Sequence, residues 1–305
     1  MIFDEKTKAL VEARIGSFDI IKNHRGDSKR TGVLEVRAQG QHLFVKIHNR
    51  LSRWHPEVFA YRNWMERLAP HVPAMVAEFN ENECFGIITT AIDGQTVNEA
   101  QLEDKARLIE VYRSAGRLLR DMQTGMTGAF FGTPKEDGAP LGASTADPVA
   151  YIKDSLSSLF ATGFEKRLFD VSHKRLLEWC LETCEVFYGD TPSPTNWDFS
   201  PNNWMADENG IFTGMIDFEN MLWGLPLDSF GVVLERYTYD KPALRNALLE
   251  GYGLPNDEIT SVKMKILAVK MAFADVLNGY LENNARFSEC GNKVLADLTS
   301  KPDLR

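Results

Sequence analysis

The hydrophobic pattern of the first third of the chain is mainly that of β-strands. Five short apolar runs are bounded by polar turns and predict strands, at 16–22, 31–38, 42–48, 72–79 and 84–91. The segment 56–68 instead repeats its apolar residues every three or four positions, which predicts a helix. Pro56 is predicted in the first turn of this helix, and Pro70 is predicted to end it. The order is therefore three strands, a helix and two strands.

Beyond Asp93-Gly94 the helical period dominates. Five segments show it, at 103–123, 148–160, 172–187, 243–253 and 258–284. A strand-and-turn segment at 196–223 separates the earlier helices from the later ones. The pattern predicts an α+β protein with two domains, a β-sheet domain with one helix at 1–92 and a larger, mainly helical domain at 93–305.

Composition narrows the functional classes. The 305 residues include 34 basic and 43 acidic side chains, which give a net charge of −9, so a nucleic-acid partner is not expected. No apolar run approaches the roughly 18 residues of a membrane span, and the charged N-terminus lacks the apolar core of a signal peptide. We therefore expect a cytoplasmic protein without a membrane partner. The four scattered cysteines indicate buried or idle thiols rather than a disulfide framework or a zinc site.

Oxygen-bearing side chains gather in the strand-and-turn segment. Asp198 and Asn203 lie five positions apart, and a short apolar strand would bring Asp217 back beside them. Carboxylate and amide oxygens are the ligands that Mg²⁺ takes while it binds substrate phosphates, and a further acid can accept a proton from a hydroxyl nucleophile. The segment thus fits phosphoryl transfer. The alternative is a β-hairpin whose Asp and Asn residues serve only its turns.

The same residues resemble the motifs of the aminoglycoside phosphotransferase family, the small-molecule branch of the protein-kinase-like fold. Its catalytic loop, H-x-D-x-x-x-x-N, is matched at 196–203, its I-D-[FW]-E segment at 216–219, and its G-x-P-x-x-D-L segment at 224–230. The resemblance covers the chain in order and implies a bilobal fold. It also implies that ATP is the phosphate donor, that Asp198 is the catalytic base, and that Asn203 and Asp217 hold Mg²⁺.

The resemblance also assigns residues of the strand-rich domain. Lys46, on the third strand, is similar to the lysine that contacts the nucleotide phosphates, although a strand lysine can also be an exposed surface residue. Glu57 resembles its glutamate partner, with Glu66 on the same helix as the competitor.

The resemblance places the adenine site at the strand end at 87–94, through the carbonyl of Thr90 and the amide of Ile92. Ser28 lies in the first turn, where it could contact the β-phosphate or simply belong to a hairpin.

One position departs from the family pattern. Asn196 stands where the family has histidine, and Trp197 follows where glycine is common. Because that histidine only orients the loop by hydrogen bonding, and Lys46, Asp198 and Asp217 are all present, we expect an active enzyme. The rival interpretation is a kinase-like scaffold that binds nucleotide without turnover. A serine hydrolase, a Rossmann dehydrogenase and a P-loop kinase are disfavoured because their motifs are missing.

The acceptor is expected to be a small hydroxylated molecule, because the stretch between Asp217 and Gly224 is too short for a protein kinase's activation loop. Glu219 and the acids Asp275 and Glu282, seven positions apart on the last predicted helix, are candidates for the acceptor pocket. They would suit a cationic acceptor such as an aminoglycoside-like antibiotic or an amino alcohol. The alternative for the last two is a solvated helix face.

Overall fold

The computed structural model describes residues 3–24, 31–81 and 83–300. The chain forms two compact units, each assembled from three stretches. The first unit comprises Met1–Leu102, Thr133–Leu141 and Asn202–Met221. The second unit comprises Glu103–Gly132, Gly142–Pro201 and Leu222–Arg305. The two units interleave along the sequence, whereas the sequence predicted a single cut after residue 92.

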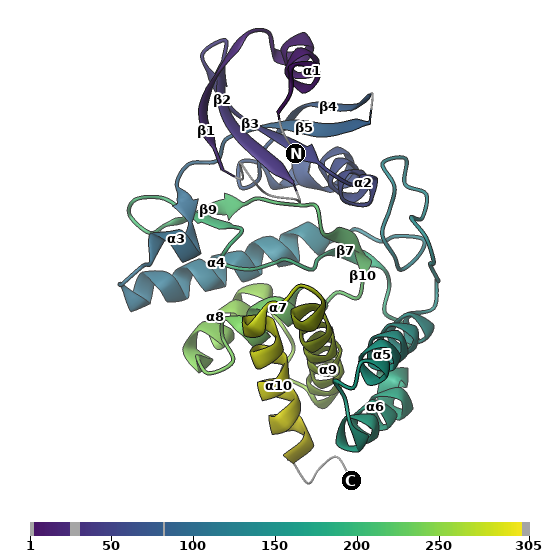
Figure 1. Ribbon diagram of the computed structural model, residues 1–305. Coiled ribbons are helices and arrows are strands. Elements are labelled where there is room, and N and C mark those ends of the chain that lie inside the picture. The colour runs from purple at the N-terminus through teal and green to yellow at the C-terminus, as the bar shows by residue number, and fades with distance from the viewer. Residues whose placement is uncertain (1–2, 25–30, 82, 301–305) are drawn as a thin grey trace. The chain divides into compact units, whose positions relative to one another are not determined.

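The first unit holds the strands of a large sheet and the helices that cover it (Figure 1). Its elements are α1 (Glu5–Ile15), β1 (Phe18–Asn23), β2 (Gly32–Ala38), β3 (Gln41–His48), α2 (Leu51–Ala60), β4 (Met75–Glu81), β5 (Cys84–Thr90), β6 (Gln95–Thr96), α3 (Val97–Ala100), β8 (Trp204–Ala206) and β9 (Phe212–Met215). The five predicted strands and the helix between the third and fourth are confirmed.

The large sheet is antiparallel, with strand order β1-β2-β3-β5-β4. Successive side chains of a strand point to opposite faces. On β3, Val45 and Ile47 therefore pack into the apolar core on one face. Lys46 and His48 point to the other face, beside α2. The alternation in this one strand places a lysine and a histidine on the face that carries the candidate site.

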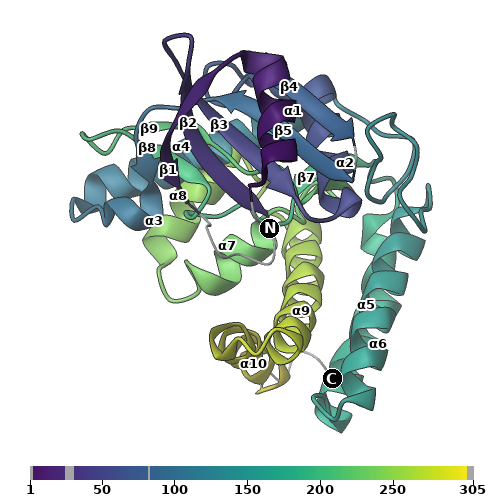
Figure 2. The same cartoon turned by 45° about the horizontal axis from the view of Figure 1, so that its top comes forward.

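Helix α1 was not predicted from the sequence. Asp4 caps it by accepting a hydrogen bond from the Thr7 amide at 2.8 Å, and Val11 and Ile15, one turn apart, pack against the sheet. Figure 2 shows the helix lying across the strands. The apolar positions are too few to stand out from the charged residues around them, so the helix depends on the sheet that it covers.

Helix α2 begins at Leu51, so the prediction that Pro56 lies in its first turn is wrong. The extra turn is held by Trp54, whose buried indole donates a hydrogen bond to the Gly86 carbonyl at 3.1 Å. Beyond α2 the helical path continues as a π-helical turn and a short 3₁₀ turn, and it ends at Leu68 before Pro70, as predicted.

The second unit is mainly helical. Its elements are α4 (Lys105–Gln123), α5 (Pro148–Glu165), α6 (Val171–Thr183), a 3₁₀ turn η3 (Cys184–Phe187), β7 (Ser193–Asn196), most of β10 (Met221–Gly224), α7 (Phe230–Arg236), α8 (Pro242–Tyr252), α9 (Glu258–Leu281) and α10 (Ala285–Ser300). Within the described ranges, no helix is long and apolar enough to cross a membrane. The four cysteines, all of which are described, are free thiols, and Cys180 and Cys184 are fully buried.

Helices α4 and α8 pack closely because glycines face backbone at their contact. A Cβ atom on Gly116 would lie 2.1 Å from the Leu248 carbonyl oxygen, and one on Gly251 would lie 2.0 Å from the Arg113 carbonyl oxygen. Only glycine allows this approach. The helix pair belongs to the unit that carries Asp198.

Candidate functional site

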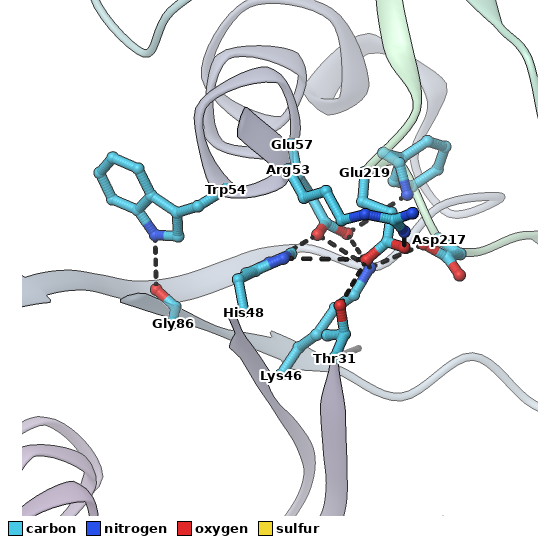
Figure 3. Close-up of polar contacts among 10 residues, drawn as sticks. Thr31, Lys46, His48, Arg53, Trp54, Glu57, Gly86, Asp217 and Glu219 are labelled. Carbon is cyan, nitrogen blue, oxygen red and sulfur yellow. Dashed lines mark hydrogen bonds and ion pairs between the residues drawn. The ribbon is translucent and has the colours of Figure 1, made fainter. Parts of the chain in front are cut away.

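A buried lysine is the centre of the candidate site in the first unit (Figure 3). The Nζ atom of Lys46 lies 2.7 Å from Asp217 Oδ1, 2.9 Å from Glu57 Oε2 and 3.1 Å from Glu219 Oε2. The sheet positions the lysine, α2 positions Glu57, and the segment after β9 positions the other two acids. The structure therefore brings together three regions that are far apart in the sequence.

Of the two acids on the predicted helix, Glu57 is the one that faces the lysine. Its side chain is only 1% exposed, and its Oε1 also accepts a hydrogen bond from the Phe218 amide at 3.2 Å. Glu66, the competitor, is exposed at the start of the short 3₁₀ turn. Glu57 thus connects Lys46 to the backbone next to Asp217. Its role in nucleotide binding stays a prediction.

Glu219 belongs to the lysine cluster, which corrects its prediction as a wall of the acceptor pocket. The side chain is buried and pairs with Lys46 and with Arg53 of α2, and Oε2 accepts a hydrogen bond from Thr31 at 2.9 Å. A carboxylate committed to two cations and a hydroxyl cannot also attract an acceptor. The sequence could not show this, because Arg53 lies 166 positions from Glu219 along the chain.

The charges of this cluster stabilise one another. Burial would lower the pKa of Lys46, but the carboxylates of Asp217, Glu57 and Glu219 outweigh it and raise this pKa. Burial also acts to raise the pKa of Glu219, yet Lys46 and Arg53 overcome it and lower this pKa to about 2. The lysine and Glu219 are therefore both charged at neutral pH.

Two groups of side chains in the first unit could hold a metal ion. His48, Glu57 and Glu219 place one ligand atom each within 4.8 Å of one another, but the Lys46 ammonium already contacts both of these acids. That group is therefore an ammonium site. Asp217 and Asn203 offer a carboxylate and an amide, which are the hard oxygen ligands that fit Mg²⁺.

The β8–β9 hairpin brings these two residues together, as predicted. Trp204 pairs with Met215, and the Ile216 amide donates to the Asn203 carbonyl at 2.9 Å, so Asn203 lies opposite the residue before Asp217. Asp217 has a φ of 67°, a left-handed conformation that non-glycine residues adopt rarely. The hairpin and this turn aim its carboxylate at Lys46.

The remaining nucleotide-site candidates are less defined by the structure. Thr90 ends β5, where its amide donates to the Ala74 carbonyl at 2.9 Å, and Ile92 follows half-buried in the connector. Their contacts with adenine stay a prediction. Ser28 lies outside the described residues.

The candidate base Asp198 lies in the second unit, directly after β7. Its amide donates to the Asn196 Oδ1 atom at 2.8 Å, and the Asn196 amide donates to the Ser229 hydroxyl at 3.0 Å. Asn196 is fully buried. The asparagine therefore orients the backbone at Asp198 by hydrogen bonding, which is the part of the usual histidine's role that we expected it to keep.

Asp275 and Glu282 do not form an acidic pair on one open face, so this prediction is corrected. Asp275 is fully buried, and its carboxylate accepts two hydrogen bonds from Arg236, one of them at 2.7 Å. Glu282 caps the C-terminal end of α9 and is exposed. Sequence spacing placed both on one face, but α7, which carries Arg236, was not predicted.

We expect Asp275→Ala to lower the free energy of unfolding by about 3–5 kcal/mol, because it leaves Arg236 buried without its partner. Urea unfolding measures this change. The matched variant Glu282→Ala should change stability by no more than about 0.5 kcal/mol. An Asp275→Ala protein with unchanged stability and a raised acceptor KM would instead support the original prediction.

Glu235, next to Arg236, escaped the sequence analysis. Burial and the neighbouring Asp275 carboxylate raise its pKa from the ordinary 4.5 to about 9. Between pH 4.5 and about pH 9, Glu235 has lost its proton in the unfolded chain but keeps it in the folded protein. The wild-type protein therefore loses stability as the pH rises through this range. No sequence pattern indicates this raised pKa, because only the fold brings Glu235 and Asp275 together.

The variant Glu235→Gln tests this pKa. Glutamine cannot ionise, so the stability of the variant relative to the wild-type protein should increase from pH 5 to pH 8. Urea unfolding at both pH values measures the difference. A difference that does not vary with pH would mean that Glu235 ionises normally.

Comparisons with known proteins agree with this geometry. The sequence model of the phosphotransferase enzyme family matches residues 22–263, whereas no curated protein matches the chain. A thermostable mutant of aminoglycoside phosphotransferase APH(4)-Ia, in a ternary complex with ADP and hygromycin B, superposes with a TM-score of 0.75 at 11% identity, over 97% of this chain and 98% of that chain. The gentamicin complex of APH(2″)-IIa gives 0.65 at 18% identity, over 97% of both chains. At such low identities the likeness establishes the fold, and the predicted α+β, kinase-like fold is confirmed.

Proposed function

Because the chain belongs to the phosphotransferase enzyme family, we propose that it transfers the γ-phosphoryl group of ATP to a hydroxyl group of a small molecule. The observation that carries the proposal is the contact of Lys46 with both Glu57 and Asp217. Phosphoryl transfer needs a lysine for the nucleotide phosphates, an acid that holds it, and a carboxylate for the metal. An ion pair that only stabilised the fold would need Lys46 and Glu57 but not Asp217.

We assign the nucleotide side of the reaction to the first unit. Lys46 would bind the α- and β-phosphates, with Glu57 holding its ammonium in place. Asp217 and Asn203 would hold Mg²⁺, which neutralises the negative charge on the β- and γ-phosphates when it is bound. Glu219 and Arg53 add a second ion pair to the lysine cluster and so stiffen it.

We assign proton transfer to Asp198. Its carboxylate would accept the proton of the acceptor hydroxyl while that oxygen attacks the γ-phosphorus. Asn196 fixes the backbone on which Asp198 stands. The acceptor is a small hydroxylated molecule, a conclusion that the bound hygromycin B and gentamicin of the solved relatives support.

The experiment is an assay of ADP release by the purified protein with MgATP and hydroxylated compounds, which include sugars, cyclitols, amino alcohols and aminoglycosides. We expect ADP to form only when Mg²⁺ and one class of acceptor are both present, and phosphorus NMR to show a phosphate ester. Binding of MgATP without ester formation from any acceptor would favour the nucleotide-binding scaffold.

A further inference from the structure

Trp197 is a large aromatic side chain that remains exposed in an otherwise buried loop. In this loop Asn196 and Phe199 are fully buried, whereas Trp197 is 48% exposed. It directly precedes Asp198, so the two Cα atoms are about 3.8 Å apart. A molecule that packs on this indole therefore lies next to the backbone that carries the proposed base.

Buried groups hold the indole in place from behind. The Lys270 ammonium lies 5.3 Å from the centre of the Trp197 ring and 5.6 Å from the centre of the Tyr151 ring. Lys270 is itself buried and pairs with the buried Asp228. A cation over an aromatic face is attracted to it, and this attraction is stronger away from water. The indole is thus a preorganised surface, and its binding to a ligand loses little conformational freedom.

The charges near this loop are balanced. Lys270 neutralises Asp228, and Arg236 neutralises Asp275. Glu235 keeps its proton at neutral pH, because burial and Asp275 raise its pKa to about 9. Of the acids that were predicted to attract a cationic acceptor, Glu219 and Asp275 are therefore paired with cations, and a polycation would gain little from the exposed Glu282 alone.

We propose that Trp197 determines acceptor specificity by stacking on a ring of the acceptor, and that this acceptor is a hydroxylated ring compound with at most one positive charge. The C–H groups on the apolar face of a sugar or cyclitol ring carry small positive charges and pack well on the negative face of an indole. The proposal rests on the proposed function, since it places the ring hydroxyl beside Asp198. A short, flexible amino alcohol has no such face.

The test compares acceptors and variants in the same phosphotransfer assay. The acceptors are methyl α-glucopyranoside and myo-inositol as uncharged rings, glucosamine as a ring with one positive charge, kanamycin as a polycation, and choline as a flexible cation. We expect the highest kcat/KM within the first three. Trp197→Gly should raise the KM of the best ring acceptor roughly tenfold, the scale of a lost aromatic contact, while the KM of MgATP stays the same.

Three further variants make the test specific. Trp197→Phe should keep most of the acceptor affinity, because it keeps an aromatic face, and Trp197→Leu should behave like glycine. Tyr188→Gly removes another exposed aromatic residue of the same unit and should leave the acceptor KM unchanged. Circular dichroism shows whether each variant is folded.

The proposal is overturned if kanamycin or choline is the best acceptor, or if Trp197→Gly keeps the wild-type KM. Failure of the proposed function looks different. In that case the wild-type protein forms no phosphate ester with any acceptor, and Asp217→Ala binds MgATP as tightly as the wild-type protein does.

Discussion

Replacing Asp198 with asparagine should lower turnover by about 10²–10⁴-fold, the usual contribution of a positioned proton acceptor. The amide has nearly the same shape as the carboxylate but cannot accept the proton of the acceptor hydroxyl. The hydrogen bond from the Asp198 amide to Asn196 uses the backbone, so the substitution leaves it in place. Single-turnover measurements with saturating MgATP and acceptor would report the chemical step directly.

The affinity for MgATP should change little in the same variant, because the nucleotide contacts are assigned to Lys46, Asn203 and Asp217. Calorimetry provides this second measurement. Glu208→Gln, which neutralises an exposed acid ten positions further along the chain, is the matched control and should keep wild-type turnover. Turnover that survives in Asp198→Asn would remove the assignment of the base. Lost MgATP binding would show that Asp198 supports the fold instead.

The lysine cluster could be predicted in part because its members obey local rules. The alternation of side chains along β3 places Lys46 on the face opposite Val45 and Ile47. Helix α2, which follows β3 in the chain, presents Glu57 to this lysine. The hairpin from Trp204 to Met215 returns the chain beside its own start. Periodicity and turn chemistry therefore fit these local contacts, but the assignment of Lys46 and Glu57 to the site came from the resemblance to the family, because the contact of Lys46 with Asp217 spans 171 positions.

The acidic residues behaved differently because their partners are remote in sequence. Glu219 forms an ion pair with Arg53, and Asp275 forms one with Arg236. Neither arginine belongs to a motif that the sequence would reveal. A buried carboxylate needs such a partner, since an unpaired charge away from water is costly. The sequence shows that an acid exists, but only the fold shows whether its charge is neutralised or available to a ligand.

The sequence showed that the loop near Asp198 departs from the family pattern at Asn196 and Trp197, but it did not indicate a function for Trp197. The replacement of the usual histidine by Asn196 keeps a hydrogen bond to the loop, which the side-chain chemistry of asparagine allows. The exposure of Trp197 and its contact with Lys270 depend on α9, about 70 positions away. Specificity is therefore harder to predict from sequence than the catalytic group beside it.

Replacing Asp217 with alanine should abolish the part of nucleotide affinity that depends on Mg²⁺. The carboxylate is the charged ligand that we assign to the metal, and the neutral amide of Asn203 cannot replace its charge. Lys46 would still be held by Glu57 and Glu219, so weak binding of metal-free ATP should persist. Calorimetric titrations of ATP with and without Mg²⁺, on wild-type protein and variant, separate the two contributions.

Two further variants show whether the effect comes from the metal ligand itself. Asp217 has a φ of 67°, which asparagine tolerates better than alanine does, so Asp217→Asn removes the charge with little added backbone strain. It should also lose most of the Mg²⁺-dependent affinity. Glu219→Gln removes another carboxylate from Lys46 but none from the proposed metal site, so its affinity should still increase with Mg²⁺. If Asp217→Ala and Asp217→Asn both bind MgATP as the wild-type protein does, Asp217 only pairs with Lys46, and the metal site must be sought elsewhere.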